Sequence, residues 1–182
     1  HATCRRQRQM CIRDRLDRAN KYYQKFIKKF PNPNEMSKAT KKEILGMWSG
    51  LGYNSRAVRL HEASKILSKN SFDSIYPEFD ILPGVGEYTK NAILSFAYND
   101  KVITQDTNVL RVFSRFFGTK DPKKFIIENQ KNMLKNIKSR KFNEVLMDFG
   151  SEICTSKSPS CNICIFDNEC KKFIHVKQST QS

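Results

Sequence analysis

The stretch from Leu82 to Ile93 reads LPGVGEYTKNAI, and it decides the fold that the sequence predicts. Gly84 and Gly86 separate two segments whose apolar residues recur at helical spacing. This pattern predicts a helical hairpin, because glycine allows a sharp reversal and leaves backbone N–H groups unobstructed at the start of the second helix. Such N–H groups can converge on an anion, for example a DNA phosphate. Alternatively, the two glycines only turn the chain between two packed helices and bind no anion.

The rest of the chain has neither strand-like alternation nor an internal repeat, so we expect an all-α fold with short loops. The expected helices are Tyr22–Phe30, Lys41–Trp48, one around Ala57–Leu67, a short one near Ser74–Ile81 that Pro77 interrupts or opens, Tyr88–Phe96, Val109–Phe117, Pro122–Ile137 and Phe142–Phe149. Gly118 is expected to end the sixth of these helices. The third is expected to leave His61 on the surface and to bury a stripe consisting of Ala57, Leu60, Ser64 and Leu67.

The composition points to a polyanionic partner. The 182 residues carry a formal net charge of +15, so nucleic acid is the first candidate and an anionic membrane the second. No apolar run approaches the roughly 18 residues of a membrane span, and no apolar stretch follows the arginine-rich start, so we expect neither a spanning segment nor a secretory signal. We expect an intracellular protein, located in the cytoplasm or nucleoid.

Residues 1–15 differ in composition from the rest of the chain. They contain five arginines and one aspartate, so +4 of the +15 lies here and +11 remains for residues 16–182. A tail of this kind is either a nucleic-acid-binding arm or a segment foreign to the natural gene. We favour the second interpretation. The expected organisation is this tail, a helical domain over 16–137 with its hairpin at about 74–98, a last helix and cysteine loop over 138–173, and a disordered tail over 174–182.

Four cysteines near the end of the chain indicate a metal site. They are spaced C-x6-C-x2-C-x5-C and are Cys154, Cys161, Cys164 and Cys170. In an intracellular protein, clustered cysteines indicate metal binding rather than disulfides. Zinc is the general expectation for C-x2-C, but zinc ribbons usually pair two such short motifs. The spacing by itself leaves zinc and an iron–sulfur cluster open.

The hairpin sequence resembles the helix-hairpin-helix of the DNA glycosylase superfamily that includes endonuclease III and the mismatch adenine glycosylases. MWSGLGYNSRAVRLHEASKIL, from Met47 to Leu67, is similar to the tryptophan-glycine segment and following helix of adenine glycosylases. FAYNDKVITQDTNVLRVFSRFFG, from Phe96 to Gly118, resembles their stretch around the catalytic aspartate. The resemblance runs from about Leu16 to Cys170. It implies an endonuclease III-like all-α domain followed by a C-terminal [4Fe–4S] cluster loop formed by the four cysteines, with a structural or redox-sensing role.

The resemblance also implies two catalytic positions. Asp106 would by itself be interpreted as a helix N-cap, whereas the family match places it at the sugar of an extruded nucleotide, where it stabilises the positive charge at C1′. Tyr88 stands where bifunctional enzymes carry a Schiff-base lysine. A phenol forms no imine with an abasic sugar, so base excision without strand cleavage is expected. Simple helix packing is the alternative role for Tyr88.

The expected partner is double-stranded DNA with a mismatched or damaged base, bound by a monomer. The resemblance implies DNA contacts from the hairpin and from the tryptophan-glycine segment: Leu82, Gly84, Val85, Gly86, Tyr88, Thr89, Trp48, Gly50, Gly52 and Tyr53.

Adenine opposite G or 8-oxoguanine is the expected target in base-excision repair, favoured by the Trp48–Tyr53 segment. A short thymine or uracil mismatch glycosylase is the alternative, because no 8-oxoguanine-reading domain follows the cysteines. A DNA-binding module without catalysis is a third interpretation. Counting back from Phe30 without gaps places Arg8 where adenine glycosylases carry a proton-donating glutamate, so we expect the natural N-terminal helix to be missing. A basic helical domain on a membrane would require neither Asp106 nor the cysteines, and is the least favoured.

Overall fold

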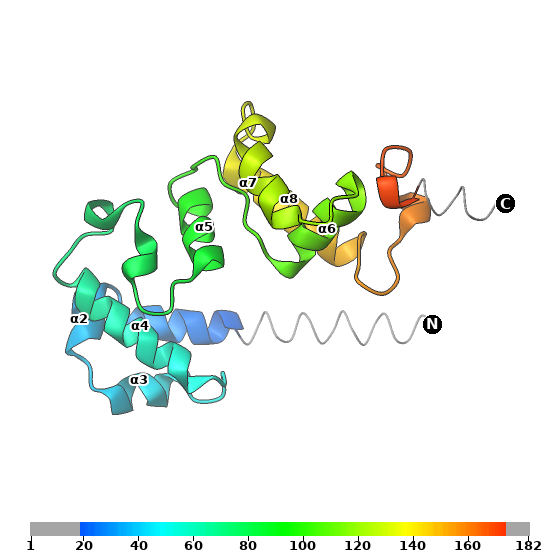
Figure 1. Ribbon diagram of the computed structural model, residues 1–182. Helices are drawn as coiled ribbons and strands as arrows, with labels where there is room; N and C mark the ends of the chain where they lie inside the picture. Colours follow the sequence, from blue (N-terminus) through cyan, green and yellow to red (C-terminus); the bar gives the residue numbers. More distant parts are fainter. Residues whose placement is uncertain (1–18, 174–182) are drawn as a thin grey trace. The chain divides into compact units, whose positions relative to one another are not determined.

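The computed structural model describes residues 19–173. The predicted tails 1–15 and 174–182, and with them Cys4 and Cys11, lie outside the described residues. Within 19–173 the chain forms helices joined by short connections and no strand, which confirms the all-α prediction (Figure 1). No helix in this range is long and apolar enough to cross a membrane. The chain divides into two compact units that meet in sequence between Val85 and Gly86, and each is described by itself.

The first unit is a small helical cluster built around α4. Its elements are a helix over residues 19–29, α2 (Pro33–Lys38), α3 (Lys41–Trp48), α4 (Asn54–Leu67) and two 3₁₀ turns, η1 (Asp73–Ile75) and η2 (Phe79–Ile81). Helix α4 packs against both α2 and α3. Buried apolar residues from four places in the sequence form the core of this unit: Phe30, Met36, Ile44 and Ala57.

Helix α2 was not predicted, because the Pro31/Pro33 pair was interpreted only as a helix stop. The same short segment also starts a helix. The side chain of Asn32 accepts a hydrogen bond from the Glu35 N–H at 2.9 Å, and Pro33 occupies the first helical position. A proline pair therefore ends one helix and begins the next within four residues.

Helix α3 has the bounds that the sequence predicts, and a capping box explains why. The Glu43 N–H donates to Thr40 Oγ1 at 3.2 Å, and the Thr40 N–H donates to Glu43 Oε2 at 2.8 Å. Hydrogen bonds from Thr40 also hold the pKa of Glu43 below its usual range. Both residues of the capping box lie within four positions of the sequence, so the start of α3 can be predicted without any tertiary information.

The short helix predicted near Ser74–Ile81 is interrupted around Pro77, as the sequence suggested, but its two parts are the 3₁₀ turns η1 and η2 and not α-helix. Pro77 lies between them and has no N–H to donate to a preceding turn. It also disfavours the helical conformation of Tyr76. The apolar spacing that suggested one helix instead places Ile75 and Phe79 in the core, one from each turn.

The buried face of α4 differs from the predicted stripe. Leu60 is 41% exposed, whereas His61, expected on the surface, is only 2% exposed. The face that packs against α2 and α3 includes Ala57, His61 and Ser64, at i, i+4 and i+7. Ala57 and Ser64 of the predicted stripe are buried, whereas Leu60 is not, and the polar His61 is buried in addition.

The buried His61 leads to a stability prediction. Neither ring nitrogen has a hydrogen-bond partner among the described residues, so burial removes water from both nitrogens without replacement. His61→Leu is expected to raise the free energy of unfolding by about 1–2 kcal/mol, as measured by urea denaturation. The neighbouring exposed change Glu62→Leu controls for helix propensity. A lower unfolding free energy for His61→Leu than for the parent would show that the imidazole contributes favourably.

The second unit is a four-helix assembly followed by the cysteine loop. Its elements are α5 (Glu87–Phe96), α6 (Thr107–Phe117), α7 (Pro122–Met133), α8 (Ser139–Glu152) and the 3₁₀ turn η3 (Cys161–Ile163). Helix α6 packs against α7 and α8, and α8 also contacts α5. Five fully or almost fully buried residues form the core: Ile103, Val109, Phe113, Ile126 and Leu134.

The ends of α6 and α7 show how these helices are terminated. Gly118 ends α6 in the left-handed conformation with φ 65°, as predicted. Helix α7 ends at Met133, before the predicted Ile137. There the Lys101 ammonium donates to the carbonyls of Leu134 and Lys135, the latter at 2.7 Å. A side chain from an earlier segment thus satisfies two carbonyls that follow the end of α7.

Candidate active site and nucleic-acid interface

The hairpin turn depends on Gly84. The Val85 N–H donates to the Leu82 carbonyl at 3.0 Å, and Gly84 has φ 87°, a conformation that favours glycine. A Cβ on Gly84 would also lie 3.1 Å from the Cβ of Arg59, whose aliphatic stem covers the turn from α4. Leu82 is buried and anchors the turn. Gly84 is therefore explained by backbone conformation and packing.

Gly86 has no such explanation. Its backbone is extended, with φ −93° and ψ −179°, and a Cβ there would meet no atom within 4 Å. Gly86 is the N-cap of α5, and no side chain caps this helix. The first N–H groups of α5 therefore have no partner within the helix. Since Gly86, Tyr88 and Thr89 are all exposed, an anion can approach these N–H groups.

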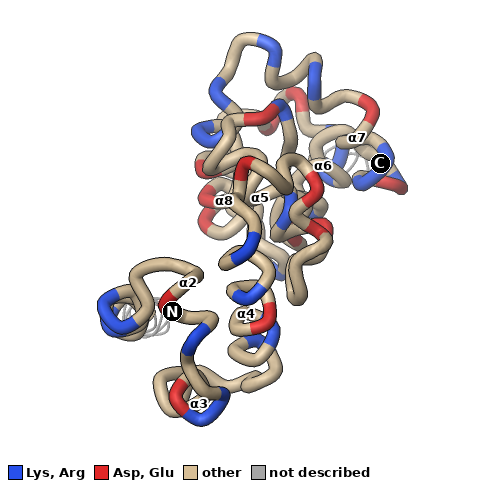
Figure 2. The backbone as a smooth tube through the Cα atoms, turned by 90° about the vertical axis from the view of Figure 1, so that its left-hand side faces the viewer, with Lys and Arg blue, Asp and Glu red and all other residues tan. Residues whose placement is uncertain are grey.

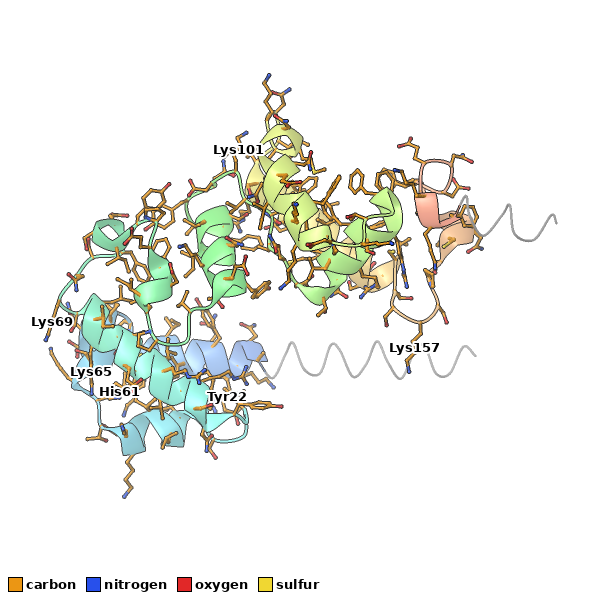
Figure 3. The ribbon with its side chains drawn as sticks, in the orientation of Figure 1. Tyr22, His61, Lys65, Lys69, Lys101 and Lys157 are labelled. Atoms are coloured by element: carbon orange, nitrogen blue, oxygen red, sulfur yellow. The ribbon has the colours of Figure 1, made fainter. Side chains whose placement is uncertain are left out.

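The turn that follows α3 is rigid. Trp48 Nε1 donates to the Gly52 carbonyl at 3.0 Å, and Tyr22 Oη donates to the Ser49 carbonyl at 2.8 Å. Gly50 has φ 89°, and a Cβ there would lie 2.6 Å from Tyr22 Oη. The ring of Tyr22 lies in the first unit (Figure 3). Both predicted glycines of this segment, Gly50 and Gly52, thus have left-handed backbones.

Tyr53 is the most exposed of the three predicted aromatic contact residues, with 81% of its surface exposed. The Arg56 guanidinium lies 5.3 Å from the Tyr53 ring centroid and 5.8 Å from that of Trp48. Cation–π contacts of this kind hold two aromatic rings and one positive charge together. The structure therefore presents an aromatic and cationic surface at the start of α4.

Asp106 is the N-cap of α6, as its position in the sequence allows. Its Oδ1 accepts from the Val109 N–H at 2.7 Å, and its Oδ2 accepts from Asn108 Nδ2 at 3.3 Å. The carboxylate is partly exposed. Because an ionised carboxylate can accept further bonds, the cap leaves lone pairs of Oδ2 available. The partial positive charge of the helix N-terminus also stabilises the negative charge.

Two arginines that sequence reasoning missed connect α6 to the cysteine loop. Arg111 donates to the carbonyls of Gly150 at 2.6 Å and Cys154 at 2.9 Å. Arg115 donates to the Thr155 carbonyl at 2.7 Å and lies 3.4 Å from Cys154 Sγ. The available signal was their i, i+4 spacing on a helix whose other face is apolar.

The four cysteines line one cavity of about 460 Å³, together with Arg115, Phe116, Phe149 and Lys157 among others. Lys157 lies on the loop between α8 and η3 (Figure 3). Burial raises the pKa of the Cys161 thiol, and the other three cysteines raise it further. The fold thus brings cysteines separated by up to sixteen positions to one cavity. No three His, Cys, Asp or Glu side chains within 19–173 are arranged to hold a metal ion.

The shape of this site bears on which group the cysteines could hold. One zinc ion draws its four sulfur ligands to within about 4 Å of one another and leaves a closed site. The cysteines here surround a cavity far larger than one ion requires. A four-iron cluster is a larger group and is bound by four thiolates. Four cysteines are the donor set that such a cluster requires, and the cavity has room for it.

The sequence matches the family model of HhH-GPD superfamily base excision DNA repair proteins over residues 13–136. The chain belongs to this superfamily. It is 40% identical over 167 residues to the adenine DNA glycosylase of Buchnera aphidicola subsp. Baizongia pistaciae, covering 86% of this chain and 46% of that protein. Its identity to the adenine DNA glycosylase of Mycobacterium tuberculosis is 32% over 151 residues, covering 78% and 50% respectively. The chain thus spans about half the length of these curated relatives.

Solved structures support the HhH-GPD fold. A thermostable thymine-DNA glycosylase superposes with a TM-score of 0.76 at 29% identity, over 85% of this chain and 76% of that one. An endonuclease III from a trapped DNA complex superposes with a TM-score of 0.68 at 24% identity, over 87% and 77%. The endonuclease III-like fold expected from the hairpin sequence is confirmed.

Proposed function

We propose that this chain is the catalytic domain of a base-excision repair DNA glycosylase that removes adenine mispaired with G or 8-oxoguanine. The observation that carries the proposal is the carboxylate of Asp106, held on an exposed helix start in a member of the HhH-GPD superfamily. Adenine is favoured because several adenine DNA glycosylases match most of this chain at 29–40% identity. The protein would act as a monomer on duplex DNA in the cytoplasm or nucleoid.

The open N–H groups at the start of α5 are the proposed phosphate contact. Contacts of this kind set the position of the protein on the duplex without reading the sequence. Lys and Arg occur in both units, including α3 and α4, and supply the accompanying positive charge (Figure 2). The net charge of +15 predicts binding that weakens steeply as salt is added.

Asp106 is proposed to act on the sugar of an extruded nucleotide. When the N-glycosidic bond breaks, the electron pair leaves with the base and positive charge develops at C1′. A fixed carboxylate nearby stabilises this charge, and water then adds to C1′ and releases a proton, while the departing base takes up one proton, so that a hydroxyl on C1′ and a neutral base result. Tyr88 is 43% exposed on α5 and is available to the DNA, yet its phenol forms no imine. We therefore propose base removal without strand cleavage.

The four-cysteine loop is proposed to hold a [4Fe–4S] cluster. The support comes from the cavity that all four cysteines line and from the two arginines that hold the loop against α6. When bound, the cluster supplies structural cross-linking of the loop and a redox-sensitive group, and the excision step needs no electron transfer.

A panel of four labelled duplexes tests the excision proposal. The duplexes carry A opposite 8-oxoguanine, A opposite G, T opposite G and U opposite G, and each reaction is split before alkali treatment. We expect alkali-dependent cleavage at adenine only. Pyrimidine release would assign the chain to the thymine or uracil class, and binding without release would support the DNA-binding module. Cleavage before alkali would contradict the assigned role of Tyr88.

Gly86→Ala separates a phosphate contact from a structural turn. Because the added methyl meets no protein atom, the melting temperature should stay unchanged, while the methyl obstructs the approach of a phosphate. We expect the dissociation constant for duplex DNA to rise roughly tenfold, equivalent to about 1.4 kcal/mol. Gly46→Ala is the matched control, because its Cβ also meets nothing within 4 Å. Binding by Gly86→Ala at the parent's affinity would rule out the proposed contact.

A further inference from the structure

The segment that leads to Asp106 is partly buried and pairs with no strand among the described residues. Residues 102–106, between α5 and α6, have no regular secondary structure, and no strand occurs within 19–173. Ile103 and Thr104 are nevertheless fully buried. Buried backbone N–H and C=O groups must find partners, and here a β-ladder is not available to supply them.

Side chains from α7 and α8 supply these partners. The Thr104 N–H donates to Asn143 Oδ1 at 2.8 Å, and Asn143 Nδ2 donates to the Val102 carbonyl at 2.9 Å. The Ile103 N–H donates to Gln130 Oε1 at 2.9 Å. Asn143 therefore pairs with this segment as a neighbouring strand would, with one donor and one acceptor.

Asn143 is fully buried, and both the oxygen and the nitrogen of its side-chain amide have hydrogen-bond partners. Its Oδ1 also accepts from Thr104 Oγ1 at 3.1 Å, and the two N–H groups on its Nδ2 are shared among the Val102 carbonyl, Ser95 Oγ at 2.8 Å and the Ser139 carbonyl at 3.0 Å. Ser95 and Ser139 are buried as well. In such a site each missing bond leaves a group without water or protein to replace it.

Helix α8 also meets the chain just after Asp106. Gly150 approaches Asn108 so closely that a Cβ on Gly150 would lie 2.9 Å from the Asn108 Cβ and 3.4 Å from its backbone. The bonds of Asn143 come two residues before Asp106, and the Gly150 contact comes two residues after it. One helix thus holds the backbone on both sides of the carboxylate.

We propose that Asn143 is a positioning residue for Asp106. It does not touch the carboxylate, and it acts by fixing the path of residues 102–104, from which the Asp106 side chain projects toward a substrate. This inference rests on the proposed glycosylase function. A displacement of about 1 Å at a reacting group can lower a rate by about 100-fold.

The test compares Asn143→Leu with Ile126→Val, which removes one methylene from the same buried core and leaves the side-chain bonds in place. The full chain is assayed for single-turnover excision from the A opposite 8-oxoguanine duplex, for duplex binding, and for hydrogen exchange over residues 102–109. For Asn143→Leu we expect about a 100-fold lower excision rate, nearly unchanged binding and lost exchange protection. Ile126→Val should retain all three properties. If Asn143→Leu does not fold, Thr104→Val removes one bond to Oδ1, and Thr104→Ser restores it.

Two results would overturn the proposal: excision at the parent's rate by folded Asn143→Leu, or an equal loss of rate in Ile126→Val. For the milder pair of variants, equal excision rates for Thr104→Val and Thr104→Ser would also overturn the proposal. If the parent chain excises no base, the proposed function fails. Hydrogen exchange alone then tests whether Asn143 positions the segment. Retained protection over 102–109 in Asn143→Leu would then exclude positioning by this residue, and lost protection would support it.

Discussion

Asp106→Asn is expected to lower the single-turnover rate of base release by about 1,000-fold. The substitution removes the negative charge that stabilises C1′ and keeps the shape of the side chain. It also keeps the cap, because asparagine serves as well as aspartate at a helix N-cap. The melting temperature and the affinity for duplex DNA should therefore change little, and both are measured on the same preparation.

Asp106→Ser provides the matched control for the cap. Serine also accepts the bond from the Val109 N–H but is neutral and shorter. We expect it to be folded and as inactive as the asparagine variant. If both variants released adenine near the parent's rate, Asp106 would be only a structural cap. A fall in stability that matched the fall in rate would also contradict a direct role in catalysis.

Replacement of one cysteine is expected to remove the cluster as a whole. The parent, purified without oxygen, should contain about four iron atoms per chain and absorb visible light. Cys161→Ser should lose most of the iron and the absorbance, because four thiolates share one cluster. Since metal binding contributes to folding free energy, the loop from 153 to 170 should also lose protection from proteolysis.

Ser158→Ala, an exposed change in the same loop, is the control and should keep its iron. If the parent contained zinc and showed no visible absorbance, the cysteines would bind a single zinc ion and not a cluster. A parent with neither metal, and with the same protease resistance as Cys161→Ser, would contradict any metal site at these cysteines.

Features encoded by nearby residues could be predicted from the sequence. The Thr40–Glu43 capping box sets the start of α3, and Gly118 sets the end of α6. The cap role of Asp106 could be predicted because its helix begins at the next residue, whereas its catalytic role was inferred from the family resemblance and stays a prediction. These signals depend on backbone groups within one helical turn, so they do not require knowledge of the tertiary fold.

Features that depend on distant partners could not be predicted. His61 looked like a surface residue because its burial comes from how α4 packs against two other helices. Asn143 carried no local signal at all, since its partners Ser95 and Thr104 lie 48 and 39 residues away. Arg111 reaches carbonyls 39 and 43 residues further on. In each case a polar side chain occupies a buried position that only the folded chain defines.

Detection of the free base tests the central claim most directly. The full chain is incubated under single-turnover conditions with a duplex that carries labelled adenine opposite 8-oxoguanine, and the released small molecules are separated and identified. We predict free adenine from the parent, an intact strand until alkali is added, and no adenine from Asp106→Asn. Tight binding of the duplex with no free adenine from the parent would contradict the claim.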